Sequence, residues 1–536
     1  MAAARCLILA LLVGCCGTVV AAPTGGESIY REGLLPSGAP LHGARASGIA
    51  LDGQAAACVK CHRRSGLGGY EGTTTVPPIL GRYLFRNRQA NLQDLSLPHI
   101  AGFVPNRDAY SDATLAEALR SGIAPGGRTL SYLMPRYDLD AESMQVLIDY
   151  LKRLGTEPVP GVSDAQIDFA TIVTPDADVA AAEGMVSVLQ NFFAVQNRVI
   201  AGEVRPLKSD REIMYRVSRR WRLHVWRLEG KPDTWRRQLE THLAAEPIFA
   251  VIAGIGARTW QPIHAFCEDK SVPCLLPNVD LPVDAERDFY PVYWSRGVLL
   301  EADLIARALR TEAGSKTPHG RVVQVYRSDD IGAAGAAALR AHFEVGERAP
   351  VDRVLSGARE AGPAALAALR SGDQVVLWLR GADLTTLPHE LPAGVGVYAS
   401  GLMTDLERAT PPAEWRQRIH MAYPFDLPDL RRVRMNFPLG WMRVQQLPVV
   451  DERVQATTYI ACQILAEAIG SMLDSFVRDF LVERIESMLS TRLDSGYYPR
   501  LGLAPGQRFA SKGGYLVHFA APSGTRIVAE GDWTTP

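Results

Sequence analysis

The chain has 536 residues, of which 57 are Lys or Arg and 58 are Asp or Glu, so its formal net charge at pH 7 is −1. This balance gives the chain no global attraction to nucleic acid or to anionic membranes. Hydrophobic residues make up 47% of the chain, as in a globular protein, and the length predicts two or three domains.

The first 22 residues have the pattern of a secretory signal peptide. A basic residue precedes the apolar run 7–13, and a series of small residues ends at Ala22. The apolar run is too short to cross a bilayer. The dipeptide Gly14-Cys15 also suits a lipoprotein signal, in which Cys15 would carry lipid. Both alternatives predict export, so we expect a periplasmic protein without a transmembrane span.

Residues 58–62 read Cys-Val-Lys-Cys-His, which is the attachment motif of a c-type haem. The two thiols bind the haem vinyl groups, and His62 is placed to ligate the iron. A zinc site would need two more ligands at metal-site spacing, and no second cysteine pair follows. We therefore predict one haem c, covalently bound through Cys58 and Cys61.

Two methionines compete for the second axial position of the predicted haem. Met134 lies in a loop stiffened by proline, whereas Met144 falls on the apolar stripe of a predicted helix and is expected in the core. The prediction is therefore Met134 opposite His62. His42 and His99 remain rivals, although both lie in loops rich in Gly and Pro, which are typical of the surface.

The segment 27–155 resembles a class I cytochrome c domain, in which C-x-x-C-H follows an N-terminal helix and a C-terminal helix packs over that helix. The resemblance implies an all-α domain with His62 and Met134 as axial ligands. In that family a proline carbonyl holds the other ring nitrogen of the histidine, and Pro77 or Pro78 is the counterpart. With both axial positions filled, the resemblance implies electron transfer rather than catalysis.

Residues 156–164 are rich in Pro and Gly and indicate a linker. Over 165–536, strand-like runs alternate with helical runs, which predicts an α/β domain with mostly parallel sheets and a length that suits two lobes around a cleft. Strands are expected over 167–173, 223–228, 249–255, 322–326, 374–379 and 396–399, and helices over 234–245, 259–269, 298–309, 333–343 and 364–369.

The stretch 249–278 resembles part of the type I periplasmic solute-binding fold, in particular the branched-chain amino acid receptor-like group. In that family, ligand groups lie at the turn before a helix and after the next strand. Thr259 and Asn278 are the matching positions, and both also suit ordinary cap and turn roles. The family's ligand-facing serines are not evident after Val173, so a conventional amino acid ligand is not implied.

The remaining cysteines and an Arg-rich segment complete the set of candidates. Cys267 and Cys274 flank a short turn, and in an oxidising compartment their spacing predicts a disulfide. Cys462 lies in an apolar helical run and is expected to be a buried small hydrophobe. Residues 215–227 interleave Arg with Trp, which favours a solvated strand edge, with a docking patch for an acidic redox partner as the alternative.

These features favour an exported, non-enzymatic electron-transfer protein whose partner is a periplasmic dehydrogenase or electron carrier. The receptor-like half would bind a small ligand or the redox partner. The alternative is a periplasmic solute-binding receptor of an ABC-type importer with an accessory haem. No nucleophile–base–acid set is evident, and no nucleic acid partner is expected.

Overall fold

The computed structural model of the protein forms two compact units, one ending at Glu157 and the other beginning at Pro158. It describes residues 25–71, 74–85, 108–203, 219–285, 287–313, 320–343, 349–355, 366–388, 390–404, 411–472, 475–492, 495–521 and 524–536. The predicted signal peptide, the lipidation candidate Cys15 and His99 lie outside these ranges.

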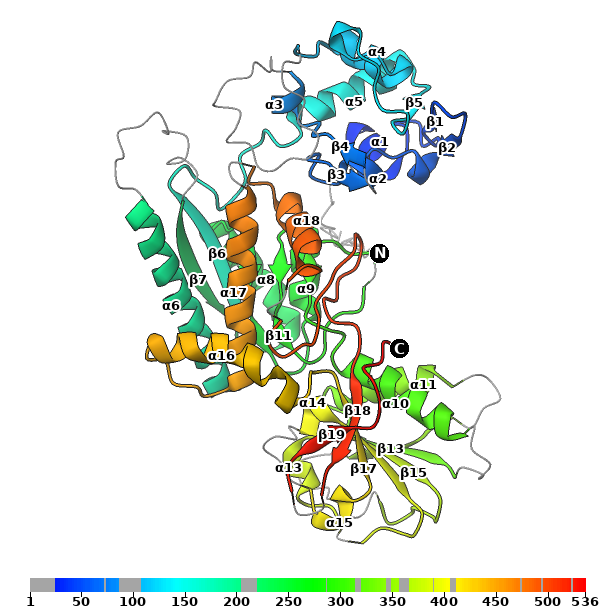
Figure 1. The fold of residues 1–536 in the computed structure, drawn as a ribbon, viewed down its shortest axis with the longest axis vertical. Coiled ribbons are helices and arrows are strands. Elements are labelled where there is room, and N and C mark those ends of the chain that lie inside the picture. The colour runs from blue at the N-terminus through cyan, green and yellow to red at the C-terminus, as the bar shows by residue number, and fades with distance from the viewer. Residues whose placement is uncertain are drawn as a thin grey trace, which may run out of the picture. The chain divides into compact units, whose positions relative to one another are not determined.

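Unit 1 contains five helices and two small sheets in its described residues (Figure 1). An antiparallel sheet has the order β2-β1-β5, and β3 and β4 form a hairpin. The expectation of an all-α domain is therefore wrong, because the glycine-rich chain after the first helix pairs as strands instead of forming a helix. The elements are α1 (Gly25–Glu32), β1 (His42–Ala44), β2 (Ala50–Asp52), α2 (Val59–His62), β3 (Gly69–Glu71), β4 (Thr74–Val76), α3 (Gly81–Leu84), α4 (Asp112–Ser121), β5 (Arg136–Tyr137) and α5 (Ala141–Arg153).

The first and last helices of unit 1 cross closely. Asp140 caps α5 by accepting a hydrogen bond from the Ser143 backbone N–H at 2.7 Å. A Cβ on Gly26 of α1 would lie 2.4 Å from the Val146 carbonyl oxygen of α5, so only glycine permits this approach. Met144 is buried in the core between these helices, as the helical pattern predicts.

Unit 2 contains two sheets with mostly parallel strands, as the alternation of strands and helices predicts. The first is ordered β11-β9-β6-β8-β10-β12, with β7 paired to β6, and the second is ordered β14-β13-β15-β16-β17-β18-β19. The strands of the first sheet are β6 (Gln166–Val173), β7 (Arg220–Arg227), β8 (Ala250–Ile252), β9 (Ile255–Gly256), β10 (Cys274–Leu275), β11 (Asn278–Val279) and β12 (Pro291–Val292). Those of the second are β13 (Val322–Arg327), β14 (Val351–Leu355), β15 (Gln374–Trp378), β16 (Gly396–Ser400), β17 (Ile419–Tyr423), β18 (Tyr515–Phe519) and β19 (Ile527–Ala529).

Each sheet of unit 2 is the centre of one lobe. Helices α6 (Val179–Glu203), α8 (Pro232–Ala245), α9 (Gln261–Asp269), α16 (Pro428–Val444), α17 (Glu452–Met472) and α18 (Arg478–Leu489) lie with the first sheet. Helices α10 (Val298–Ala313), α11 (Gly332–Ala341), α13 (Gly381–Leu384), α14 (Gly401–Thr404) and α15 (Ala413–Arg416) lie with the second. Of the helix expected over 364–369, residues 366–369 are described, and there residue 366 is helical and 367–368 form a turn.

The chain crosses between the lobes of unit 2 three times: between β12 and α10, between β17 and α16, and between α18 and β18. Two of the crossings are hydrogen-bonded to each other. The Tyr293 N–H donates to the Arg508 carbonyl at 2.8 Å, and the Ala510 N–H donates to the Tyr293 carbonyl at 2.9 Å. The lobes are therefore joined by neighbouring strands rather than by a single flexible linker.

Part of the predicted linker belongs to unit 2. The Asp168 N–H donates to the Gly161 carbonyl at 2.8 Å, and the Arg219 side chain donates to the Ser163 carbonyl at 2.6 Å. Residues 161–163 are therefore fixed beside the first strand of the unit, and the break between the units lies within the predicted linker 156–164.

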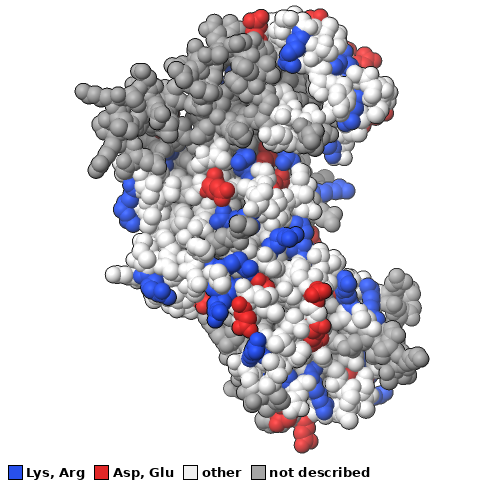
Figure 2. Space-filling view, in the orientation of Figure 1, with Lys and Arg blue, Asp and Glu red and all other residues white. Residues whose placement is uncertain are grey.

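The Arg/Trp segment forms the edge strand β7, of which 219–227 are described. Trp221 and Trp226 are buried, whereas Arg220 and Arg227 are exposed. This alternation agrees with a solvated strand edge. Figure 2 shows Lys and Arg side chains interspersed with Asp and Glu over the visible face, as the near-zero net charge implies.

Candidate functional site

The C-x-x-C-H motif forms the short helix α2, which begins after Cys58 and ends at Arg63. The His62 N–H donates to the Cys58 carbonyl at 2.9 Å, and this turn directs the motif's side chains to one side. Arg63 has a φ of 64° and so stops the helix directly after His62.

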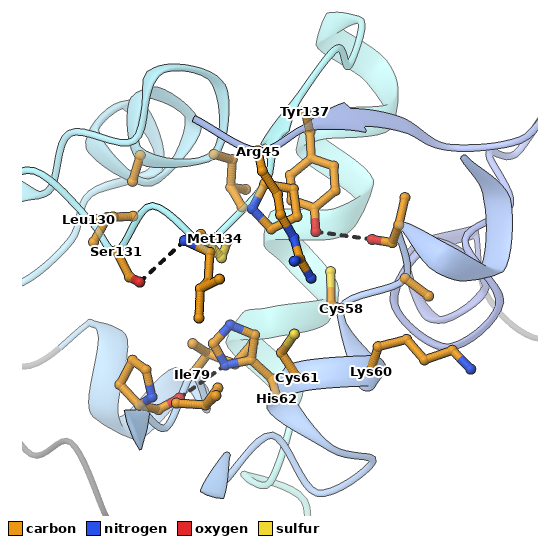
Figure 3. A pocket seen from close by; sticks show the side chains of 18 of the residues that line it. Arg45, Cys58, Lys60, Cys61, His62, Ile79, Leu130, Ser131, Met134 and Tyr137 are labelled. Carbon is orange, nitrogen blue, oxygen red and sulfur yellow. Dashed lines mark hydrogen bonds between the residues drawn. The ribbon is translucent and has the colours of Figure 1, made fainter. Parts of the chain in front are cut away.

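These side chains line a cavity of about 360 Å³ in unit 1. Figure 3 shows Cys58, Cys61, His62 and Met134 around one space. Apolar side chains from several elements complete the wall, among them Ile79, Leu84, Leu115, Leu119, Leu130 and Leu151. The structure therefore brings together four residues that the sequence predicts to act together, and keeps Met144 in the core.

The orientation of His62 is set by one hydrogen bond. Its Nδ1 lies 3.0 Å from the Pro77 carbonyl oxygen, so Pro77 rather than Pro78 makes this contact. Because a carbonyl only accepts, Nδ1 carries the proton and Nε2 carries the lone pair. Burial lowers the pKa of His62 to about 4, against the opposing effect of the Pro77 carbonyl. The imidazole is therefore neutral at physiological pH and able to act as a ligand.

The Cys58 thiol and the Tyr137 phenol, which line the same cavity as His62, are also buried. Burial raises the pKa of Cys58 to about 12, against the opposing effect of a hydrogen bond with Tyr137, so this cysteine is a neutral thiol. The Tyr137 hydroxyl donates to the Ala56 carbonyl at 3.0 Å. His42 lies elsewhere and pairs with Asp52 at the surface.

These residues fit a covalently attached haem. Two sulfur atoms at C-x-x-C spacing, a neutral imidazole with its Nε2 lone pair and a thioether all face a single apolar space. Cys58 and Cys61 would hold the porphyrin edge, and His62 and Met134 would hold the iron. The sequence identifies all four positions because the motif is local and the proline loop is distinctive.

Unit 2 places both candidate residues in the first lobe, where Thr259 follows β9 and Asn278 is the first residue of β11. Thr259 precedes α9, and its hydroxyl accepts a hydrogen bond from the Gln261 N–H at 3.3 Å. The Asn278 side chain accepts a hydrogen bond from Thr457 at 2.6 Å and donates to Thr458 at 3.2 Å. Asn278 therefore connects β11 to α17, and its amide already has protein partners.

Four charged side chains, the charged cluster, belong to the segments that follow three strands and to the first turn of α17. In the first lobe Arg453 donates to Asp280 at 2.8 Å, and in the second Arg380 binds Asp330 at 2.7 and 2.8 Å. The Asp330 hydrogen bond raises the pKa of Arg380, and Asp280 of the other lobe adds to the effect. The two ion pairs are therefore close enough to influence each other.

The opposite lobes also approach each other directly, since Arg258 lies 4.0 Å from Asp329. Burial alone would raise the pKa of Asp330, but Arg380 outweighs it and holds that pKa below its usual value. The cluster was missed in the sequence. Its signal was present, because Asp330 and Arg380 come shortly after β13, which ends at Arg327, and β15, which ends at Trp378.

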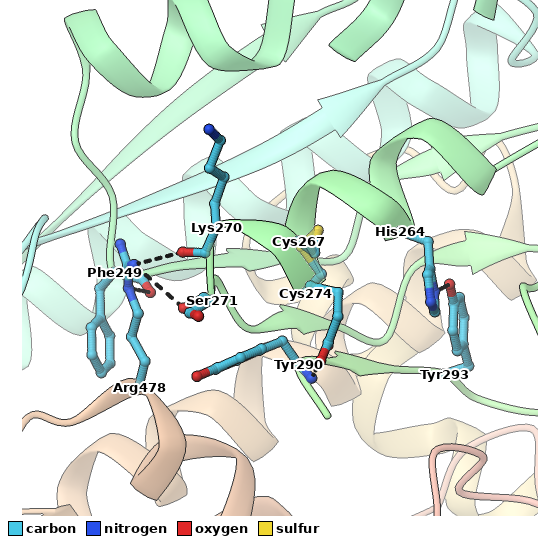
Figure 4. The surroundings of a disulfide bond; sticks show 10 residues. Phe249, His264, Cys267, Lys270, Ser271, Cys274, Tyr290, Tyr293 and Arg478 are labelled. Carbon is cyan, nitrogen blue, oxygen red and sulfur yellow. Dashed lines mark hydrogen bonds between the residues drawn. A yellow bond between two sulfur atoms is a disulfide. The ribbon is translucent and has the colours of Figure 1, made fainter. Parts of the chain in front are cut away.

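The structure joins Cys267 at the end of α9 to Cys274 in β10, with Cα atoms 6.1 Å apart (Figure 4). Arg478 of α18 donates to the Phe249 carbonyl at 3.1 Å and to the Ser271 carbonyl at 3.3 Å. The disulfide and this arginine together hold the turn between α9 and β10. Cys462 is fully buried in α17, as expected.

No protein-family model matches the chain, and no curated protein matches it. Among solved structures, the chain is similar to a fatty acid ABC transporter substrate-binding protein from Thermomonospora curvata, with a TM-score of 0.50, 11% identity, and coverage of 71% of this chain and 95% of the other. It is also similar to a branched chain amino acid ABC transporter from Thermus thermophilus with bound valine (TM-score 0.48, 11% identity, coverage 69% and 97%). A third similar structure is an extracellular ligand-binding receptor from Rhodopseudomonas palustris HaA2, with a TM-score of 0.46, 13% identity, and coverage of 68% of this chain and 100% of the other.

The first of these likenesses shows the fold: a two-lobed α/β architecture of the periplasmic-binding-protein type. It also corrects the sequence-based classification of the chain as an electron-transfer cytochrome. The matched protein, which covers most of this chain, is a substrate-binding protein. Within the described ranges, no three or more His, Cys, Asp or Glu side chains are grouped to hold a metal ion. The electron-transfer role and the redox partner are accordingly not supported.

No helix in the described part of the chain is long and apolar enough to cross a membrane.

Proposed function

We propose that this protein is an exported solute receptor, whose unit 2 binds a small polar molecule between its lobes and whose unit 1 carries haem c as an accessory group. The observation that carries the proposal is the two-lobed fold with three crossings and charged side chains at the strand ends of both lobes. It is not proposed as an enzyme. The predicted signal peptide supports a periplasmic location for this receptor.

The charged cluster supports a ligand that carries charge or strong hydrogen-bonding groups. Asp280 and Arg453 belong to the first lobe, and Asp330 and Arg380 belong to the second. A bound solute could break the ion pair in each lobe and form its own contacts with the side chains of that pair. Such a ligand would hold the lobes together, because its affinity depends on both. Thr259, half-buried beside the exposed Arg258, is a further candidate contact.

A solute screen on the full chain tests this proposal. The solutes are amino acids and fatty acids, the classes named for the similar proteins, together with dicarboxylates and polyamines. We expect one class to raise the melting temperature of unit 2 and to bind in calorimetry. Arg380→Met should weaken that binding at least about tenfold, since charged hydrogen bonds contribute about 1.5–3 kcal/mol. Arg236→Met, which removes a surface arginine of α8, is the control. Binding that Arg380→Met and Asp280→Asn leave unchanged would contradict the proposed site.

The accessory haem has its own support in the cavity of unit 1, where His62, Met134 and the two cysteines converge. When bound, haem supplies an iron that changes oxidation state and ligation, which suits a sensor. The chain's residues would fix its position: Pro77 orients the imidazole, and the apolar wall excludes water from the ring.

Haem staining of the full chain on a denaturing gel tests covalent attachment, with expression in a host that matures c-type cytochromes. We expect staining in the natural sequence and none after Cys58→Ala with Cys61→Ala. Met134→Ala should remove the thioether-to-iron absorption at the red end of the oxidised spectrum, whereas Met144→Leu should retain it. A natural chain without stain would refute haem attachment and leave the solute proposal untouched.

A further inference from the structure

Helix α16 of unit 2 has two apolar faces, and only one of them is covered. Met435, Pro438 and Met442 are buried on the face that packs in the first lobe. On another side of the same helix Phe437 is 65% exposed and Val444 is 77% exposed. A helix with a single core needs only one apolar face, so the second one requires a separate explanation.

The exposed face is a continuous row, the exposed stripe, formed by Leu430, Val433, Phe437 and Val444. The first three follow at spacings of three and four residues, which places them on one side of a helix. Gly440 completes the row, and a Cβ there would meet nothing within 4 Å. The stripe is therefore open along the length of α16.

The surroundings of the stripe are basic. Residues 430–450 contain four arginines and no Asp or Glu. Arg431 is buried and donates to the Tyr423 hydroxyl at 2.6 Å, and Arg434 pairs with Asp426. Arg432 and Arg443 are exposed at the two ends of the stripe. Figure 2 shows Lys or Arg side chains beside uncharged surface over α16.

The apolar row and the arginines beside it together indicate which kind of partner binds to the exposed stripe. A second copy docked on the stripe would bring arginines against arginines, which is unfavourable. An exposed apolar row flanked by Arg432 and Arg443, on a helix whose one acidic residue, Asp429, is paired with Arg526, suits the interface of an anionic bilayer, where the apolar side chains enter the lipid and the guanidinium groups bind phosphates.

We propose that α16 binds this protein to the surface of an anionic phospholipid membrane, with Phe437 and Val433 inserted and Arg432 and Arg443 on the headgroups. The helix lies in the plane of the interface and does not span the bilayer. This placement is independent of the solute receptor proposal, because it involves neither the charged cluster nor the cavity of unit 1.

Vesicle co-sedimentation of the full chain tests the proposal. Cys15→Ser is included to exclude lipid attachment. Vesicles of phosphatidylglycerol mixed with phosphatidylcholine are compared with pure phosphatidylcholine. We expect binding to the mixed vesicles only, and binding that weakens as salt rises. Arg432→Gln with Arg443→Gln should lower the affinity about 30-fold, at about 1 kcal/mol per arginine.

A further double variant distinguishes the contribution of the inserted apolar side chains from that of the arginines. Val433→Ser with Phe437→Ser should weaken binding by at least about tenfold, and should leave the melting temperature unchanged because both side chains are exposed. The controls are Val354→Ser, an exposed valine of the second lobe, and Arg220→Gln with Arg237→Gln, two exposed arginines of the first. Equal binding to both vesicle types, binding that the stripe variants leave intact, or self-association that they abolish would overturn the proposal.

Discussion

The ion pair between Arg508 and Glu486 offers the sharpest test of how unit 2 is held together. Both side chains are 2% exposed. Arg508 lies on a crossing between the lobes, where its guanidinium also donates to the Phe289 carbonyl and its backbone carbonyl accepts from Tyr293. Glu486 belongs to α18 of the first lobe. The pair therefore fixes the crossing strand to that lobe.

The magnitude follows from this burial. Glu486→Gln removes the carboxylate that pairs with Arg508 in a site closed to water, and we expect a loss of about 3–5 kcal/mol in the free energy of unfolding. Arg508→Met with Glu486→Leu removes both charges. Its main cost is the loss of the Arg508 hydrogen bond to the Phe289 carbonyl, about 1–3 kcal/mol. The double variant should thus be more stable than the single one.

Scanning calorimetry of the full chain measures these differences, with the transition of unit 2 identified by its response to the variants. Arg227→Met, which breaks an exposed pair with Glu183, is the control and should cost less than about 1 kcal/mol. A loss below about 1 kcal/mol for Glu486→Gln, or a double variant no more stable than Glu486→Gln, would refute the reasoning.

Three other predictions concern pH, the disulfide and the domain boundary. Burial raises the pKa of Glu301 to about 8, so the native state keeps a proton that the unfolded chain releases near pH 4.3. The stability of unit 2 should therefore fall as pH rises from about 4.3 to about 8, by at most about 1.4 kcal/mol per pH unit, and Glu301→Gln should lose this dependence in thermal unfolding. Replacing Cys267 and Cys274 by Ser should cost about 2–3 kcal/mol, because the bridge closes a short loop, and mass analysis after alkylation without reductant checks the bond itself. Cleavage after Glu157 should leave unit 2 with its full melting temperature, whereas a chain that starts after Ser163 should melt lower because it lacks the Gly161 and Ser163 carbonyl contacts.

Much of unit 2 could be predicted because its signals are local. The strand-like runs 322–326 and 374–379 became β13 and β15 with shifts of one residue, since apolar strands bounded by turns are defined by their own residues. The cysteine motif and the proline loop likewise identified the cavity residues of unit 1. In contrast, the glycine-rich segment after α1 has no clear periodicity, and its strands depend on pairing with β5, far along the chain.

The sequence by itself determined those features whose physical cause lies within a few residues: the spacing of Cys58, Cys61 and His62, the helical face that buries Met144, and the alternation that makes β7 an edge strand. Only the tertiary structure decided the rest, because the partners are distant. Asn278 contacts Thr457, 179 residues away, so its side-chain amide is already hydrogen-bonded within the protein. The charged cluster and the two faces of α16 likewise arise only when the lobes form, since burial and exposure belong to the folded chain and not to its sequence pattern.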